Sequence, residues 1–159
     1  MSDTHSKKVS ESEVTMTELV LPNHTNPLGN LLGGQLMYWI DICAALCSSR
    51  HANMVCVTAS VDKIDFHHPI KLGDVVTLVA SVNRVFRSSL EVGVKIFSET
   101  FAGGKKRHTN SAYLTFVAIN SEGRPVEAIK VIPETEDEKR RYDEAEKRRM
   151  LRLQNKDIT

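Results

Sequence analysis

The segment from Leu36 to Cys47 constrains the fold more than any other part of the sequence, because every side chain in it is apolar except Asp41. With its flanks, from Gly34 to about Arg50, the segment is long enough to predict a helix rather than a strand. Arg50 and His51 suit the last turn of such a helix. Because the run is apolar on all sides, we expect a buried central helix and not a surface helix.

The segments after this helix change to the period of two that is typical of strands. Residues 55–62 alternate, and residues 74–86, 89–101 and 108–120 are rich in Val, Ile, Thr and aromatic side chains. A weaker strand pattern covers Thr15 to Leu21, before the helix. Since the later strands are joined by short connections, they are expected to pair antiparallel. The sequence predicts an α+β fold, in which about five strands wrap around one long helix.

The two ends of the chain differ in composition from this domain. Residues 1–13 are polar and are predicted to be a flexible tail, residues 14–132 form the domain, and residues 133–159 form a charged helix. Thr135 and Glu138 have the spacing of a capping box, and Glu144 and Arg148 are one of several acid-before-base pairs at a spacing of four. This helix either lies solvated on the domain surface or binds a partner.

Charge and cysteine content narrow the classes of function. With 21 Lys and Arg against 20 Asp and Glu, the net charge of +1 gives no reason to expect nucleic acid or an anionic membrane as partner. No apolar run approaches the roughly 18 residues of a membrane helix, and the N-terminus does not resemble a signal peptide. The three cysteines favour core packing of reduced thiols in a cytoplasmic protein. His67 and His68 have no third ligand at suitable spacing, so no metal site is expected.

The carboxylate of Asp41 is costly in an apolar helix unless it is paired or faces a polar cavity. A structural role, such as capping or pairing with a base from the sheet, remains open. The turn before the helix contains Gly33 and Gly34, and unpaired N–H groups at a helix start favour developing negative charge, as in an oxyanion hole. Glycines are also ordinary turn residues. Asn26 adds an amide that can orient water or a carbonyl.

The spacing between the glycines and Asp41 sets a geometric condition. Asp41 lies eight residues beyond Gly33, which is about 12 Å along a helix. One reacting carbonyl cannot contact both groups of the same chain. Either Asp41 has another role, or Gly33 of one subunit meets Asp41 of another and the protein is at least a dimer.

Four stretches, with their order and spacing, resemble the hotdog-fold acyl-CoA thioesterases. They are TNPLGNLLGGQLMYWID, VCVTASVDKIDFHHPIKLGDVV, RSSLEVGVKI and IPETEDEKRRYDE. The similarity is to the cytosolic (brain-type) acyl-CoA hydrolase family, in a form with one hotdog domain. The resemblance implies an antiparallel sheet around a central helix, a homodimer that can assemble into a trimer of dimers, and hydrolysis of acyl-CoA to free acid and CoA without a cofactor or metal.

The family also implies an active site shared across the dimer interface, with Asn26 and Asp41 as its polar residues. The thioester carbonyl would point at the N–H of Gly33 or Gly34. Asp41 would act either as general base on water or as nucleophile, and the sequence does not choose between them.

Three groups are candidates for contacts with CoA. A turn with a cation and two hydroxyls suits a phosphate, and so does a basic hairpin tip, although charges at turns also serve solubility. An acid in the strand after the helix is placed either near the pantetheine or in a structural role at the sheet edge. The turn consists of Arg87, Ser88 and Ser89, the basic hairpin tip of Lys105, Lys106 and Arg107, and the acid is Asp62.

Two other functions are less consistent with the sequence. A hotdog dehydratase uses a catalytic His with an acid, and the central helix has no His before His51. A hotdog acyl-CoA sensor that regulates transcription is expected to lack the helix acid and to carry a DNA-binding segment, whereas Asp41 is present.

Overall fold

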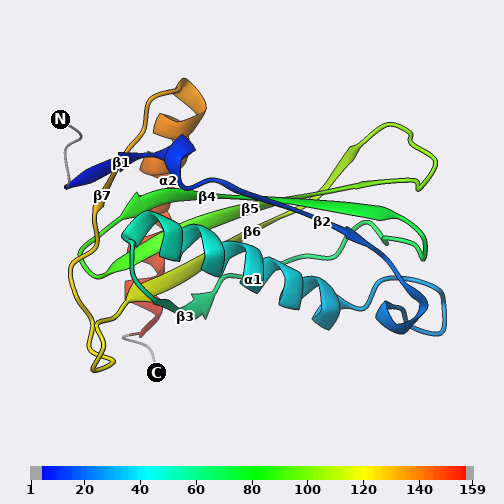
Figure 1. Cartoon of the computed structure of the whole chain (residues 1–159), viewed down its shortest axis with the longest axis horizontal. Coiled ribbons are helices and arrows are strands. Elements are labelled where there is room, and N and C mark those ends of the chain that lie inside the picture. The colour runs from blue at the N-terminus through cyan, green and yellow to red at the C-terminus, as the bar shows by residue number, and fades with distance from the viewer. Residues whose placement is uncertain (1–4, 157–159) are drawn as a thin grey trace.

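The computed structural model, which describes residues 5–156, places two helices on opposite faces of an antiparallel sheet. Helix α1 (Gly33–Ala52) lies in front of the sheet and helix α2 (Glu136–Lys156) lies behind it in Figure 1. The α+β arrangement predicted from the sequence, which is the hotdog fold, is confirmed.

The sheet has five strands in the order β2-β4-β5-β6-β3, with every neighbouring pair antiparallel. Its long central strands follow one another along the chain, as short connections require. Strand β3 is one of the two edges. The strands are β2 (Val14–Leu19), β3 (Cys56–Val61), β4 (Val75–Val85), β5 (Ser89–Glu99) and β6 (Arg107–Ala118).

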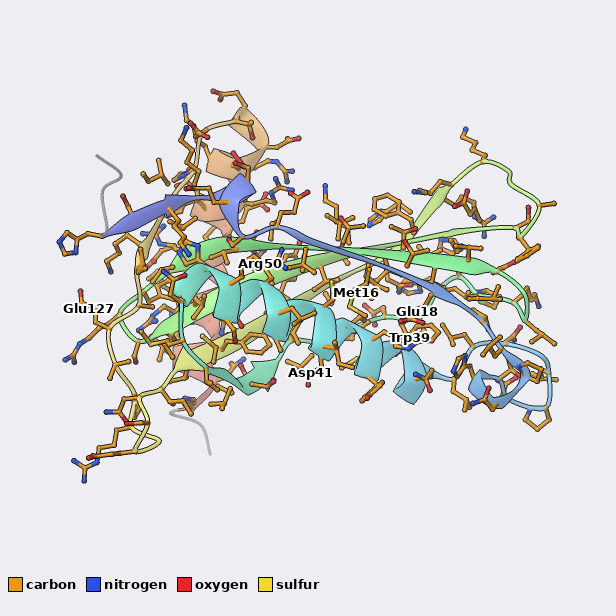
Figure 2. The ribbon with its side chains drawn as sticks, in the orientation of Figure 1. Met16, Glu18, Trp39, Asp41, Arg50 and Glu127 are labelled. Atoms are coloured by element: carbon orange, nitrogen blue, oxygen red, sulfur yellow. The ribbon has the colours of Figure 1, made fainter. Side chains whose placement is uncertain are left out.

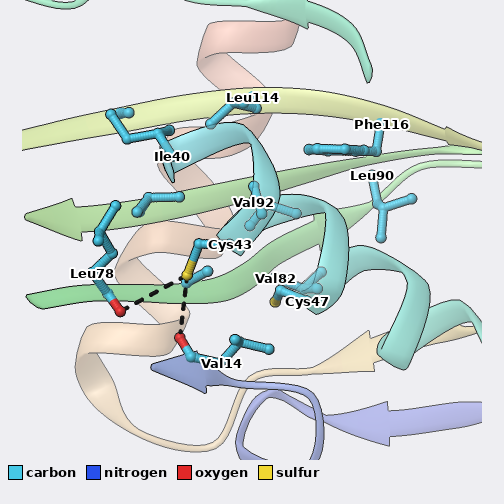
Figure 3. Packing of buried hydrophobic residues seen from close by; sticks show 14 of the residues in the cluster. Val14, Ile40, Cys43, Cys47, Leu78, Val82, Leu90, Val92, Leu114 and Phe116 are labelled. Atoms are coloured by element: carbon cyan, nitrogen blue, oxygen red, sulfur yellow. Dashed lines mark hydrogen bonds between the residues drawn. The ribbon is translucent and has the colours of Figure 1, made fainter. Parts of the chain in front are cut away.

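The core lies between α1 and one face of the sheet (Figure 3). Alternate residues of the strands, such as Leu90 and Val92, are buried against Ile40 and Cys43 of the helix. The thiol of Cys43 donates to the carbonyl oxygens of Val14 (3.7 Å) and Leu78 (3.8 Å). Burial raises the pKa of Cys43 to about 11 and that of Cys47 to about 12, so the predicted packing role of the cysteines is confirmed.

The prediction that α1 is buried all round is wrong for the single chain. The side chains of Tyr38 and Leu46 are 61% and 49% exposed, and Asp41 is half-buried. One stripe of the helix covers the sheet, while Tyr38 and Leu46 on the opposite side are left exposed by the described part of the chain. An exposed apolar face of this kind is typical of a surface that contacts another molecule.

Of the flexible tail predicted for residues 1–13, residues 1–4 lie outside the described residues, and the rest contains regular structure. Strand β1 (Ser6–Lys8) pairs parallel with β7 (Lys130–Ile132), and a short 3-10 helix η1 (Val9–Glu11) follows. Lys7 Nζ donates to Arg50 O and to Asn53 Oδ1, both at 2.7 Å, at the end of α1. These contacts order the segment. A second 3-10 helix, η2 (Pro22–His24), precedes α1.

Helix α2 lies on the surface of the domain, in agreement with one of the two interpretations of its sequence. Its capping box is confirmed, since Glu138 N donates to Thr135 Oγ1 (3.1 Å) and Thr135 N donates to Glu138 Oε2 (2.9 Å). The expected pair of Glu144 with Arg148 is replaced by an inward contact. Arg148 donates through Nε and Nη2 to both oxygens of Glu91 (2.9 and 2.8 Å), a fully buried residue of β5.

Candidate functional site

The N-terminus of α1 presents free backbone donors. The first helical hydrogen bond runs from Leu36 N to Leu32 O (3.1 Å), and Leu32 provides no side-chain cap. The N–H groups of the first turn, those of Gly33 and Gly34 included, are therefore without an acceptor in the helix. A Cβ added to Gly34 would have nothing within 4 Å, so packing within the chain does not require a glycine there, and the space beside it is open to another molecule.

Asn26 is held in the turn that leads to this helix. Its Oδ1 accepts from Leu28 N (3.0 Å) and Asn30 N (3.1 Å). Because two N–H donors fix the oxygen, the NH₂ group must point the other way. Among the described residues, Nδ2 of Asn26 has no hydrogen-bond partner. It is therefore a donor available to a ligand, as the predicted role of Asn26 requires.

Asn26 and Gly33 line the same hollow, which has a volume of about 200 Å³. Its walls combine apolar side chains with a few polar groups, which is the usual character of a small-molecule site. The apolar residues include Leu31, Leu36, Phe66 and Ile70, and the polar ones include His68 and Asn110. The structure thus brings together two of the predicted site residues.

Asp41 does not line this hollow. Figure 2 shows its side chain on the side of α1 away from β2, toward β3. Thr58 Oγ1, on β3, donates to Asp41 Oδ1 at 2.7 Å. The carboxylate is thus oriented by a strand hydroxyl and keeps Oδ2 for another partner. Gly33 and Asp41 both belong to the unbroken helix α1, so the rise of about 12 Å between them that was estimated from the sequence applies.

Thr58 is a candidate site residue, through its contact with Asp41, that the sequence alone did not identify. It is one of several polar residues that alternate along β3, and nothing in that pattern marks its contact with a helix residue 17 positions earlier. Only the pairing of β3 with β6, which places this strand beside α1, creates the contact.

The residues predicted to bind CoA lie at two ends of the molecule. Arg87 and Ser88 lie in the turn between β4 and β5, and Ser89 begins β5. Lys105 and Lys106 follow the other end of β5, and Arg107 begins β6 (Figure 1). The eleven residues of β5 separate the two groups by about 33 Å. One ligand cannot reach both groups of the same chain by a compact path. Ser89 Oγ also accepts from Arg149 Nη1 of α2 (3.3 Å).

Asp62 is engaged in a structural contact at the sheet edge, which is one of the two roles considered for it. Its carboxylate pairs with Arg152 Nη1 of α2 at 3.1 Å, and its backbone N–H donates to Tyr113 O at 2.9 Å. The carboxylate therefore helps to fix α2 against the end of β3.

Residues 5–156 contain no cluster of three or more His, Cys, Asp or Glu side chains arranged to hold a metal ion. Within the same range, no helix is both long enough and apolar enough to cross a membrane.

Sequence comparison identifies the class of protein. Residues 28–101 match the model of the Thioesterase superfamily. An uncharacterised acyl-CoA thioester hydrolase of Bacillus subtilis is 43% identical over 80% of this chain and 74% of its own length. Acyl-coenzyme A thioesterase 11 of Mus musculus is 48% identical over 89% of this chain but only 24% of its own length, so the chain spans about a quarter of that relative. The chain belongs to the thioesterase superfamily, among its acyl-CoA thioester hydrolases.

Solved structures give the same result. An apo-hexameric acyl-CoA thioesterase superposes with a TM-score of 0.93 at 37% identity, covering 98% of this chain and 99% of that one. An acyl-CoA hydrolase of Staphylococcus aureus, solved with butyryl coenzyme A, coenzyme A and coenzyme A disulfide, superposes with a TM-score of 0.87 at 39% identity and 96% coverage of both chains.

Proposed function

We propose that this protein is an acyl-CoA thioesterase, which hydrolyses fatty acyl-CoA to free acid and CoA at sites shared by two subunits. The observation that carries the proposal is the arrangement of Asn26, Asp41 and Thr58. Variants of the Staphylococcus aureus hydrolase have been solved with alanine in place of an asparagine, an aspartate and a threonine, which in that protein are separated by 15 and 17 positions. The same three residue types have the same separations here.

The proposed chemistry follows from the geometry of the groups that each subunit contributes to a shared site. The thioester carbonyl accepts hydrogen bonds from the N–H groups at the start of α1, where the helix dipole stabilises the developing oxyanion. Asn26 Nδ2 donates to the carbonyl or to the attacking water. Asp41 of the other subunit is the general base, or the nucleophile, and Thr58 fixes its orientation through the 2.7 Å hydrogen bond. Thioester hydrolysis by this route needs no metal or cofactor.

The subunit arrangement is supported by an exposed apolar surface. The outer face of α1 and the neighbouring edge strand β3 expose Tyr38 (61%), Leu46 (49%), Val57 (43%) and Val61 (40%). An open strand edge beside such a patch is a typical site for pairing with a second copy. Burying this surface against a partner would bring Asp41 to an interface, and relatives of hexameric form are known. We propose a homodimer, or a trimer of such dimers.

The CoA moiety is expected to use basic turns from different subunits, since the two basic groups of one chain lie too far apart. Arg87 with Ser88, or Lys105 with Lys106 and Arg107, would each bind a phosphate by charge-assisted hydrogen bonds. A cytoplasmic location is supported by three free cysteines and by rat and mouse relatives named cytosolic acyl coenzyme A thioester hydrolase.

Release of CoA tests the activity and defines the substrate. We expect the native protein to release CoA from at least one of acetyl-, hexanoyl-, lauroyl- and palmitoyl-CoA, measured with a thiol reagent against the rate without enzyme. The buried cysteines, whose pKa values are raised, should not contribute to the signal from the folded protein. Binding of all four compounds without hydrolysis would contradict the enzyme proposal and favour an acyl-CoA sensor.

A further inference from the structure

Residues 63–69, between β3 and β4, form one wall of the hollow at the start of α1, although no regular secondary structure holds them. Phe66, in the middle of this segment, stays 54% exposed. Its ring lies 3.6 Å from the place where a Cβ on Gly33 would be. The ring therefore stands beside the backbone donors that the proposed reaction uses.

One hydrogen bond fixes this segment in place. Asn110 of β6 donates through Nδ2 to the carbonyl oxygen of Asp65. Within the described part of the chain, this is the bond that ties the backbone of residues 63–69 to the sheet, since the next main-chain bonds are those of Asp62 and Ile70 at either side. The position of the Phe66 ring thus depends on a side chain from a distant strand.

The sheet is irregular at the point that carries Asn110. The register of β5 with β6 passes from Ile96↔Asn110 to Phe97↔His108, so Thr109 is an extra, bulged residue. Thr109 and Asn110 are consequently both buried, at 8% and 6% exposed, and Thr109 Oγ1 donates to Ile96 O at 3.2 Å. Bulges redirect side chains and are frequent next to active sites. This bulge places the Asn110 amide between the hollow and the loop.

We propose that Phe66 is a substrate-contacting residue that packs on the acyl thioester and keeps water from the far side of its carbonyl. Asn110, which also lines the hollow, is a positioning residue that acts on the substrate through the Asp65 carbonyl and the Phe66 ring. This inference rests on the proposed function and assigns the wall of its site.

A double-mutant cycle tests this connection. Phe66→Ala and Asn110→Leu, the second of which keeps the branched shape of the side chain but removes the donor, are each expected to lower kcat/KM for the preferred acyl-CoA by about 10-fold. The kcat/KM of the double variant should be no lower than that of Phe66→Ala alone, because both substitutions remove the same contribution, the packing of the Phe66 ring on the substrate. Phe66→Tyr should retain activity. Phe101→Ala, which alters a 74% exposed ring on the β5–β6 connection, and Asn120→Ala, which alters a turn-forming amide, are the matched controls.

Binding of a non-hydrolysable thioether analogue of the acyl-CoA, measured by calorimetry, tests the role of Phe66 and Asn110 separately from the proposed hydrolysis. Its Kd should rise in the Phe66→Ala and Asn110→Leu variants and not in the controls. If the native protein is active but the losses of the two single variants multiply in the double variant, the wall assignment is overturned. The same holds if neither single variant loses activity. In both cases the proposed function still stands. An inactive native protein would contradict the proposed function, while the analogue's Kd would still decide the role of Phe66.

Discussion

Replacing Asp41 with asparagine is expected to lower kcat for acyl-CoA hydrolysis by about 10²–10⁴-fold, because a positioned base or nucleophile contributes roughly that factor. Asparagine keeps the shape and can still accept the hydrogen bond from Thr58, so the fold and the subunit contacts should persist. The measurement is steady-state CoA release, with the subunit assembly followed by light scattering.

Thr58→Val is expected to lower activity as well, but less than Asp41→Asn does. It removes the 2.7 Å hydrogen bond to Asp41 but leaves the carboxylate, so we expect a loss of about 10-fold, in line with a base that has lost its orientation. Thr17→Val on β2 is a matched control, since it changes the same residue type on the opposite edge strand. Full activity of Asp41→Asn would contradict the assigned role of this residue.

The second large expected effect is a loss of stability when the contact that attaches α2 to the sheet is weakened. Glu91 is fully buried and receives hydrogen bonds from Asn83 Nδ2 (3.0 Å) and from Arg148. Arg148 also lies 3.7 Å from the centre of the Tyr113 ring. Glu91→Gln is expected to lower the free energy of unfolding by about 3 kcal/mol, because it leaves a largely buried guanidinium without its counter-charge. Urea denaturation at fixed protein concentration measures this value.

A surface pair on the same helix gives the control. Arg140 and Glu144 are 3.4 Å apart, and their side chains are 56% and 38% exposed, so Glu144→Gln should cost less than about 1 kcal/mol. Replacing Glu91 and Arg148 together by leucine should recover part of the loss. Arg152, which also contacts Glu91, keeps its pairing with Asp62, so no unpaired charge remains, whereas Asn83 Nδ2 loses its acceptor. Equal effects of Glu91→Gln and Glu144→Gln would show that the buried pair does not hold α2.

The sequence predicted the fold well because its periodicity is strong. The long helix and the strands of the sheet follow directly from the apolar run and from the alternation after residue 55. The sequence did not predict β1 and β7, since strands of three residues carry little pattern. It also paired Arg148 with Glu144, because local spacing cannot show that α2 covers the outer face of β5.

The candidate site was predicted in part. Asn26 and Gly33 are near in sequence and do meet at one hollow, and the distance argument for Asp41 used only the helix rise. Thr58, Phe66 and Asn110 were missed because each contributes through a contact between distant segments. The sequence also grouped two sets of CoA candidates that the length of β5 keeps apart.

The shared site is the central claim, and mixing of inactive subunits tests it most directly. Asn26→Ala and Asp41→Ala homodimers are both expected to be nearly inactive. In a mixed dimer, one site carries both changes and the other carries neither. After dissociation and random reassembly of equal amounts, activity should return to about a quarter of the native value, as two-fold symmetry requires. If each site lies within one chain, every site in the mixture carries one change. No recovery, with mixed dimers present, would contradict the shared site.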